Sequence, residues 1–291
     1  MPGTGVAARS VRSGHTDFMG DTMHVRALTA VRVAVAALAG ALFVTTAAVQ
    51  PARADHHAPA TPEILSVSVH GGRTVVLGPN QTLAFQATLV ARDAVGIHPR
   101  GIQFVLRRPD GLYLDAAHDL PSGCEPVNAT TSVCTEWFRI DTGSPEVTNR
   151  YAGDWSLEAH VMNNYLDTDP GRSVTYEQDA ATVKVRRSSK LTFVASPNPV
   201  RQGQDVGTLG RLTAADWETG TYASAPGQTV ELGFCATPCR TVESLRTLRT
   251  GAQGLTGTSY PATRDGSWWL RFDGTGQLAP TYSPGVVVDV Q

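Results

Sequence analysis

The sequence predicts an all-β chain of two antiparallel β-sandwiches in tandem, preceded by an export segment. Apolar and polar residues alternate with a period of two along most of the chain, which is typical of half-buried strands. No window of useful length has the i, i+3, i+4 spacing of an amphipathic helix. Clusters of Gly, Pro, Asn and Asp separate the alternating runs, as turns do in sandwiches.

Residues 23–54 have the parts of a secretory signal peptide. Arg26 and Arg32 precede an apolar run at residues 33–49, and residues 52–54 read Ala-Arg-Ala, a small-residue cleavage site. We expect residues 1–22 to be a mis-called start and residues 55–61 to be a flexible N-terminal tail. An uncleaved membrane anchor is the alternative, because 17 apolar residues reach the lower limit of spanning length. The cleavage site favours a secreted, extracellular protein with no membrane attachment after cleavage.

The charge of the mature chain argues against nucleic acid as a partner. Removing residues 1–54 takes away five arginines and two aspartates, which leaves 19 basic and 24 acidic groups and a formal net charge of -5. Phosphate binding requires a concentrated basic surface, which this balance does not supply. Lys184 and Lys190 are the two lysines among 24 basic residues, a composition that indicates a GC-rich genome.

The four cysteines form two close pairs, one in each half of the chain. Cys124 and Cys134 are ten residues apart, and Cys235 and Cys239 are four apart. Four cysteines permit three pairings. Because each half contains its own pair, we expect two local disulfides that clip loops. A four-thiolate zinc site is the alternative, but the spacings do not resemble paired zinc knuckles.

The first predicted sandwich covers residues 62–187. Its turns lie at residues 71–72, 79–80, 109–111 and 169–171. The inward rows between them are Leu65, Val67 and Val69; Leu83, Phe85, Ala87 and Leu89; Ile102, Phe104 and Leu106; Phe138 and Ile140; Trp155, Leu157, Ala159 and Val161; Ala181, Val183 and Val185.

The second predicted sandwich covers residues 188–291 and repeats this alternation. The join at residues 185–190 is short, so we expect limited freedom between the two sandwiches. The predicted strands contain Leu191 and Phe193; residues 206–212; Val230, Leu232 and Phe234; residues 242–248; Trp268, Leu270 and Phe272; Val286, Val288 and Val290.

Several stretches resemble a known group of proteins. Residues 196–204, 214–220 and 265–272 resemble the C-terminal immunoglobulin-like module of secreted actinobacterial proteins, and residues 67–72 and 92–97 resemble the sandwich that usually precedes it. The resemblance covers most of residues 60–291. It implies two immunoglobulin-like sandwiches and export, and says little about chemistry beyond a loose association with calcium. Trp269 and the second cysteine pair depart from the group's usual pattern.

The sequence favours a protein that is not an enzyme. Residues 161–291 contain no histidine, so the second sandwich cannot supply a Ser-His-Asp or Cys-His arrangement. Neither a G-x-S-x-G nor an H-E-x-x-H motif occurs anywhere in the chain. A paired-carboxylate glycosidase has no fixed motif and stays open as an alternative.

An acidic stretch between two strands is a candidate calcium site. Asp167, Asp169, Glu177 and Asp179 place four carboxylates within thirteen residues, and Ca²⁺ prefers several oxygen ligands gathered together. A solvated acidic turn is the simpler interpretation, since Asp-Pro-Gly is a good turn on its own.

The expected mature N-terminus is a candidate copper site. Cleavage after Ala54 gives a chain that begins Asp55, His56, His57. The free amine, two backbone nitrogens and the His57 imidazole then supply four nitrogens suited to planar Cu(II) coordination. Coincidence in a flexible tail is the alternative. The hypothesis therefore depends on where the peptidase cuts.

Two tryptophans are candidates for glycan binding. Strand alternation sends Trp268, Leu270 and Phe272 to one face and Trp269 to the other, and it places Trp137 opposite Phe138. We therefore expect Trp137 and Trp269 to be exposed. Each lies near an arginine, so a cation-π contact on the sheet face is the alternative.

Together these features predict a secreted, monomeric, non-catalytic binding or structural protein. The expected partner is an unknown extracellular protein or a glycan, with the cell wall as one source. One face of each sheet packs in the core and the other faces solvent. We therefore expect the loops at the sandwich ends to bind the partner. A calcium- or copper-binding extracellular module is the alternative function.

Overall fold

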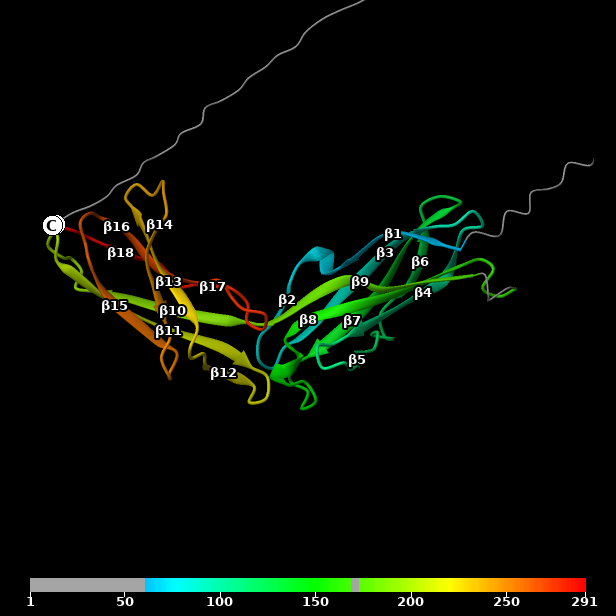
Figure 1. Cartoon of the computed structure of the whole chain (residues 1–291), viewed down its shortest axis with the longest axis horizontal. Coiled ribbons are helices and arrows are strands. Elements are labelled where there is room, and N and C mark those ends of the chain that lie inside the picture. The colour runs from blue at the N-terminus through cyan, green and yellow to red at the C-terminus, as the bar shows by residue number, and fades with distance from the viewer. Residues whose placement is uncertain (1–60, 169–172) are drawn as a thin grey trace, which may run out of the picture. The chain divides into compact units, whose positions relative to one another are not determined.

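The computed structural model describes residues 61–168 and 173–291, and it confirms the predicted all-β fold (Figure 1). The helical elements in these ranges are two short 3-10 turns, η1 (His70–Gly72) and η2 (Asn149–Tyr151). No helix in the described ranges is long and apolar enough to cross a membrane. The expected signal peptide, residues 23–54, lies outside the described residues, as does all but the last residue of the expected tail.

The first sandwich consists of a four-stranded and a five-stranded sheet, with strand orders β1-β3-β7-β6 and β2-β9-β8-β4-β5. The pairing is antiparallel except between β2 and β9, which are parallel. The strands are β1 (Glu63–Val69), β2 (Val75–Leu77), β3 (Thr82–Arg92), β4 (Ile97–Arg107), β5 (Tyr113–Leu114), β6 (Gly123–Pro126), β7 (Thr131–Asp141), β8 (Gly153–Asn163) and β9 (Val174–Arg187).

This strand order is that of an immunoglobulin-like sandwich. In that fold strands A, B, E and D form one sheet, and strands C, F and G form the other. Here β1, β3, β7 and β6 take the A, B, E and D positions, and β4, β8 and β9 take the C, F and G positions. After β1, the chain crosses to the other sheet, where the short β2 pairs with β9 at its edge.

The second sandwich also consists of two sheets, but different strands lie at the edges of these sheets. In one sheet β11 lies between β10 on one side and β12 and β15 on the other; in the second the order is β14-β13-β16, with β17 and β18 beside β16. A parallel bridge from Val200 to Val290 matches the parallel edge of the first sandwich. The strands are β10 (Ser189–Ser196), β11 (Asp205–Asp216), β12 (Thr221–Ser224), β13 (Thr229–Ala236), β14 (Glu243–Arg249), β15 (Leu255–Pro261), β16 (Gly266–Phe272), β17 (Thr281–Tyr282) and β18 (Val286–Val288).

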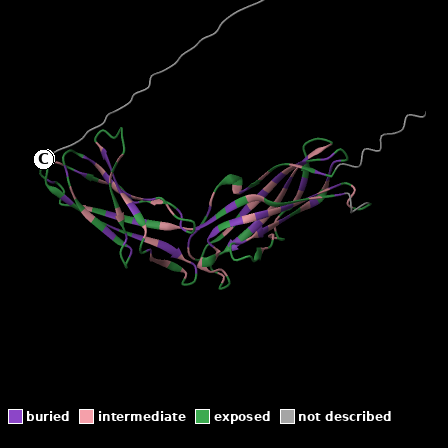
Figure 2. Cartoon of the chain, viewed as in Figure 1, coloured by how far each residue is buried: buried purple, intermediate pink, exposed green. Residues whose placement is uncertain are grey.

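Each sandwich buries the apolar rows that the alternation predicts (Figure 2). Trp155 on β8 is 1% exposed and packs in the first core, and Trp268 on β16 is 2% exposed and packs in the second. Burial of these large aromatic side chains contributes strongly to the stability of each half. The assignment of Trp155 and Trp268 to the core is confirmed.

The inward orientation predicted for Leu65 is wrong. The pairing of β1 with β3 shifts register between Ile64 and Ser66, which is a β-bulge. The side chain of Leu65 is consequently 45% exposed, and Ile64 packs against the core. An extra residue in one strand reverses the inward and outward sides beyond it, and a period-two pattern does not reveal where that happens.

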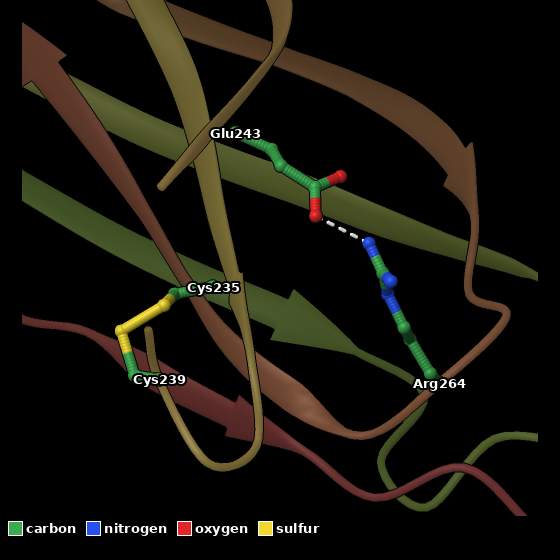
Figure 3. Close-up of a disulfide and its surroundings, with 4 residues drawn as sticks. All are labelled: Cys235, Cys239, Glu243 and Arg264. Atoms are coloured by element: carbon green, nitrogen blue, oxygen red, sulfur yellow. Dashed lines mark hydrogen bonds and ion pairs between the residues drawn. A yellow bond between two sulfur atoms is a disulfide. The ribbon is translucent and has the colours of Figure 1, made fainter. Parts of the chain in front are cut away.

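Both expected local disulfides are present. Cys124 and Cys134 lie directly opposite each other on β6 and β7. Cys235 and Cys239 close the loop that follows β13, near the ion pair of Glu243 and Arg264 (Figure 3). All four thiols are consumed, which leaves none for a zinc site.

The two sandwiches are joined through a packed contact. Strand β9 ends at Arg187 and β10 begins at Ser189, so a single residue connects them. Beyond this connection, Trp217 packs with the core of the first sandwich, where it is 3% exposed, although it follows β11 of the second. Its indole N–H donates a hydrogen bond to the carbonyl oxygen of Leu77 at 3.3 Å.

Asn149 of η2 completes this contact from the first sandwich. Its Oδ1 accepts a hydrogen bond from the backbone N–H of Trp217 at 3.0 Å, and its Nδ2 donates to Asp216 at 2.8 Å. Burial opposes ionisation of Asp216, but hydrogen bonds from Asn149 and Thr219 outweigh it and hold the pKa of this carboxyl below its ordinary value. Limited freedom between the sandwiches stays a prediction.

Candidate functional site

A shallow hollow around Trp269 lies on the outer face of the β14-β13-β16 sheet. Strand β16 alternates strictly, so Trp268, Leu270 and Phe272 are buried while Trp269 and Arg271 are partly exposed on the other face. Trp269 is half-buried rather than fully exposed as the alternation alone predicts. The difference arises because its indole lies against the neighbouring strand.

Gly233 on β13 makes this position of the indole possible. It is the register partner of Trp269 in the pairing of β13 with β16. A Cβ at residue 233 would lie 2.7 Å from both Cε2 and Nε1 of Trp269, closer than real Cβ contacts. The absence of a side chain at Gly233 therefore lets the aromatic ring lie against the sheet.

An ion-pair network borders the ring. Arg271 is opposite Glu231 across the two strands, and its Nη2 lies 2.8 Å from Glu231 Oε2. Its Nε lies 2.9 Å from Asp273 Oδ1. The charge of Glu231, followed by that of Asp273, raises the pKa of Arg271, so the guanidinium keeps its charge at any physiological pH.

The hollow has a volume of about 490 Å³ and mixes aromatic, apolar and polar groups. Tyr282 and Val242 at its margin are 61% and 62% exposed. A half-exposed aromatic ring beside fixed hydrogen-bonding groups suits a ligand with one apolar face and a polar edge. The lining residues are Glu231, Val242, Trp269, Arg271, Tyr282, Ser283 and Gly285.

A second hollow contains Trp137, the other tryptophan that the sequence singles out. It lies on the outer face of the β1-β3-β7 sheet and has a volume of about 480 Å³. Trp137 is also half-buried, and its register partner on β3 is Gln86. Both hollows lie on sheet faces, whereas the sequence predicts recognition at the loops of the sandwich ends.

The neighbouring arginines are paired with carboxylates rather than stacked on these tryptophans. Arg139 donates two hydrogen bonds to Asp119, at 3.1 and 2.8 Å, and Arg271 bridges Glu231 and Asp273. Within the described ranges, the cation-π contacts involve tyrosine or phenylalanine rings. The indole faces are therefore not occupied by arginine.

The carboxylates of the acidic stretch have separate partners where the structure describes them. Asp167 lies 3.5 Å from His98 Nε2. Asp179 accepts a hydrogen bond from Arg107 at 3.3 Å and another from Ser156. Glu177 lies on β9 with Ala159 as its register partner, and Asp169 falls outside the described residues.

The described parts of the chain contain no group of three or more His, Cys, Asp or Glu side chains that could hold a metal ion. The calcium hypothesis thus has no support from the residues that can be placed. The copper hypothesis rests on Asp55, His56 and His57, which lie outside the described residues.

Glu136 on β7 is a half-buried titratable residue that the sequence did not single out. Its Oε2 accepts a hydrogen bond from the backbone N–H of Phe104 at 2.7 Å. Burial raises the pKa of this carboxyl, which means that the folded state favours its neutral form. The resulting stabilisation is complete below the ordinary pKa of a glutamate and is lost as the pH rises through the raised pKa.

Glu136→Gln keeps an acceptor for the Phe104 N–H and removes the charge. We expect the variant to gain stability relative to the wild type as the pH rises from about 4 towards 7, because only the wild type then ionises a half-buried carboxyl group whose pKa is raised by desolvation. Urea unfolding at a series of pH values measures this difference. Parallel stability curves for the two proteins would show that the burial of Glu136 has no such consequence.

The fold defines the class of protein as a tandem immunoglobulin-like β-sandwich protein. No protein-family model and no curated protein matches the sequence. Solved structures with detectable similarity include PorU, a nectin-like molecule and the adhesin InvE. All are distant in sequence.

Dimeric latent PorU from Porphyromonas gingivalis is 16% identical over 79% of this chain and 20% of that chain, with a TM-score of 0.28. The mouse nectin-like molecule 4 ectodomain is 16% identical over 80% and 64%, with a TM-score of 0.27. The Yersinia pseudotuberculosis adhesin InvE is 14% identical over 78% and 58%, with a TM-score of 0.26. This chain thus spans less than two thirds of each of them. These TM-scores support no inference from those proteins, so the class stands on the strand order.

Proposed function

We propose that this protein is an exported, non-catalytic binding protein that recognises a carbohydrate on the Trp269 hollow. The observation that carries the proposal is the half-buried Trp269 side chain, whose indole lies against Gly233 beside the Glu231–Arg271 pair. Sugar rings present a face of C–H groups that packs on an aromatic ring and a rim of hydroxyls that needs hydrogen bonds. The hollow offers both kinds of contact.

Export is supported by two independent features of the chain. Residues 23–54 have the pattern of a cleavable signal peptide. All four cysteines are in disulfides, which persist in oxidising compartments and are rare in the cytosol. A binding role without catalysis agrees with the hollow, where the carboxylate of Glu231 is neutralised by Arg271.

The proposal is tested by sedimentation with insoluble peptidoglycan, chitin and cellulose, using the chain from residue 55 onward. We expect at least one polymer to sediment the wild type. Trp269→Ala should weaken that binding about fivefold or more, because stacking on an aromatic ring contributes about 1 to 3 kcal/mol. Tyr113→Ala is the control, since Tyr113 is a 56% exposed aromatic residue on β5, in the other sandwich.

Gly233→Ala provides a second variant that leaves Trp269 in place. Its methyl group would displace the indole from the sheet, so we expect binding to fall towards the level of Trp269→Ala. Failure of all three polymers to sediment the wild type, or unchanged sedimentation of both variants, would remove the Trp269 hollow as the ligand site.

A further inference from the structure

The Trp137 hollow is bordered by the η1 turn. Residues His70, Gly71 and Gly72 of η1 all have positive φ, at 52°, 62° and 75°. Two of these three positions are glycine, the residue that adopts this left-handed conformation at least cost. The turn places His70, Gly71 and Arg73 at the border of the hollow that also contains Trp137.

The floor of this hollow carries hydrogen-bonding groups that the protein itself does not use. Ser68, Gln86 and Thr88 line it from β1 and β3. Among the described residues, none of these three side chains makes a hydrogen bond to another protein group. They lie beside a half-exposed indole, so they can bind the hydroxyls of a ring stacked on Trp137.

The charge of the hollow is positive. Arg73 donates to the carbonyl oxygen of His70 at 3.3 Å, and no aspartate or glutamate lines the hollow. Partial burial, and then the charge of Arg73, lower the pKa of His70, so the imidazole is neutral at pH 7 and Arg73 supplies the charge. In the Trp269 hollow, by contrast, the charge of Arg271 is balanced by Glu231.

We propose that the Trp137 hollow is a second saccharide site, and that it selects a sugar that bears a carboxylate. The sugar ring packs on Trp137, its hydroxyls bond to Gln86 and Thr88, and its carboxylate pairs with the guanidinium of Arg73. Arginine suits this role because its planar donors match the two oxygens of a carboxylate. A Cβ at Gly71 would meet no atom within 4 Å, so the η1 turn beside Arg73 is open at this position.

This inference shares with the proposed function the premise that the protein binds saccharides, but it concerns another sheet, another sandwich and another ligand class. The probes are oligogalacturonate and its methyl ester, which have the same ring and differ in the charge of the carboxyl group. Calorimetric titration of the chain from residue 55 onward measures both affinities. We expect the acid to bind about tenfold more tightly than the ester at low salt, and less so as salt is added.

Three variants separate the contribution of the Arg73 charge from that of stacking on Trp137. Arg73→Gln should reduce the preference for the acid to nearly one-to-one and leave the affinity for the ester unchanged. Trp137→Ala should weaken both ligands by a similar factor. Tyr113→Ala is the control and should leave both titrations unchanged, because Tyr113 is an exposed aromatic residue on β5 and lines neither hollow. Trp269→Ala, the variant that tests the proposed function, is titrated alongside to show whether the same ligands bind the other hollow.

The titrations also distinguish failure of the second site from failure of the proposed function. Equal affinity for acid and ester, or an acid preference that survives Arg73→Gln, overturns the assignment of the carboxylate to Arg73. Loss of acid binding in Trp269→Ala together with unchanged binding in Trp137→Ala assigns all saccharide binding to the Trp269 hollow; that result overturns the second site and supports the proposed function. Absence of any oligogalacturonate binding also overturns the second site, while the sedimentation test still decides the first.

Discussion

Trp217→Ala is expected to lower the free energy of unfolding by about 3 to 5 kcal/mol, the usual cost of removing a large aromatic side chain from a core. Trp217 is 3% exposed and packs with the first core from the second sandwich. The substitution also leaves the Leu77 carbonyl oxygen without its indole partner. The carbonyl keeps its hydrogen bond from the Ser188 N–H at 2.8 Å, so the loss comes mainly from the cavity in the core.

Urea denaturation of the wild type and the variant measures this effect. Trp269→Ala is the matched control, because it removes the same side chain from a half-exposed position, and we expect it to cost much less. A cost for Trp217→Ala no greater than that of the control would contradict the packing of this residue with the first core.

Asp93→Ala is expected to be the next most damaging change, at about 2 to 4 kcal/mol. The Asp93 side chain is buried in the turn between β3 and β4, and its two oxygens accept hydrogen bonds from Asn163 Nδ2 at 3.0 Å and from the Val95 N–H at 2.9 Å. Asn163 is itself fully buried. Removing the carboxylate leaves the buried Asn163 Nδ2 without its Asp93 partner and frees the N–H of the exposed Val95.

Thermal and urea unfolding both measure the effect of Asp93→Ala. Asp115→Ala is a suitable control, since Asp115 is an exposed aspartate of the same sandwich. If the two variants lost similar amounts of stability, the Asp93–Asn163 contact would not be a significant stabilising element.

The fold was largely predictable from sequence because each strand buries one side. The alternation around Trp155 and Trp268 places both in the cores, and the cysteine spacing indicates the local disulfides that form. The bulge at Leu65 could not be predicted, since it depends on the pairing of β1 with β3. The packing of Trp217 with the first core was equally hidden, because it depends on a contact between residues 140 positions apart.

The sites were predictable only in part. Alternation correctly places Trp137 and Trp269 on outer faces, but it does not show that Gly233 lies under one indole or that the η1 turn borders the other. Both features arise from neighbouring strands or turns. The signal that could have indicated the first is the glycine in β13, within an otherwise continuous strand pattern.

The most direct measurement of carbohydrate binding at Trp269 is the NMR signal of the indole N–H groups, since the chain has five tryptophans. Titration with soluble fragments of the polymer that sediments the protein should shift the Trp269 signal and leave the signals of Trp155, Trp217 and Trp268, which lie in the cores, in place. An unmoved Trp269 signal under conditions of saturated binding would contradict the assignment of this hollow as the ligand site.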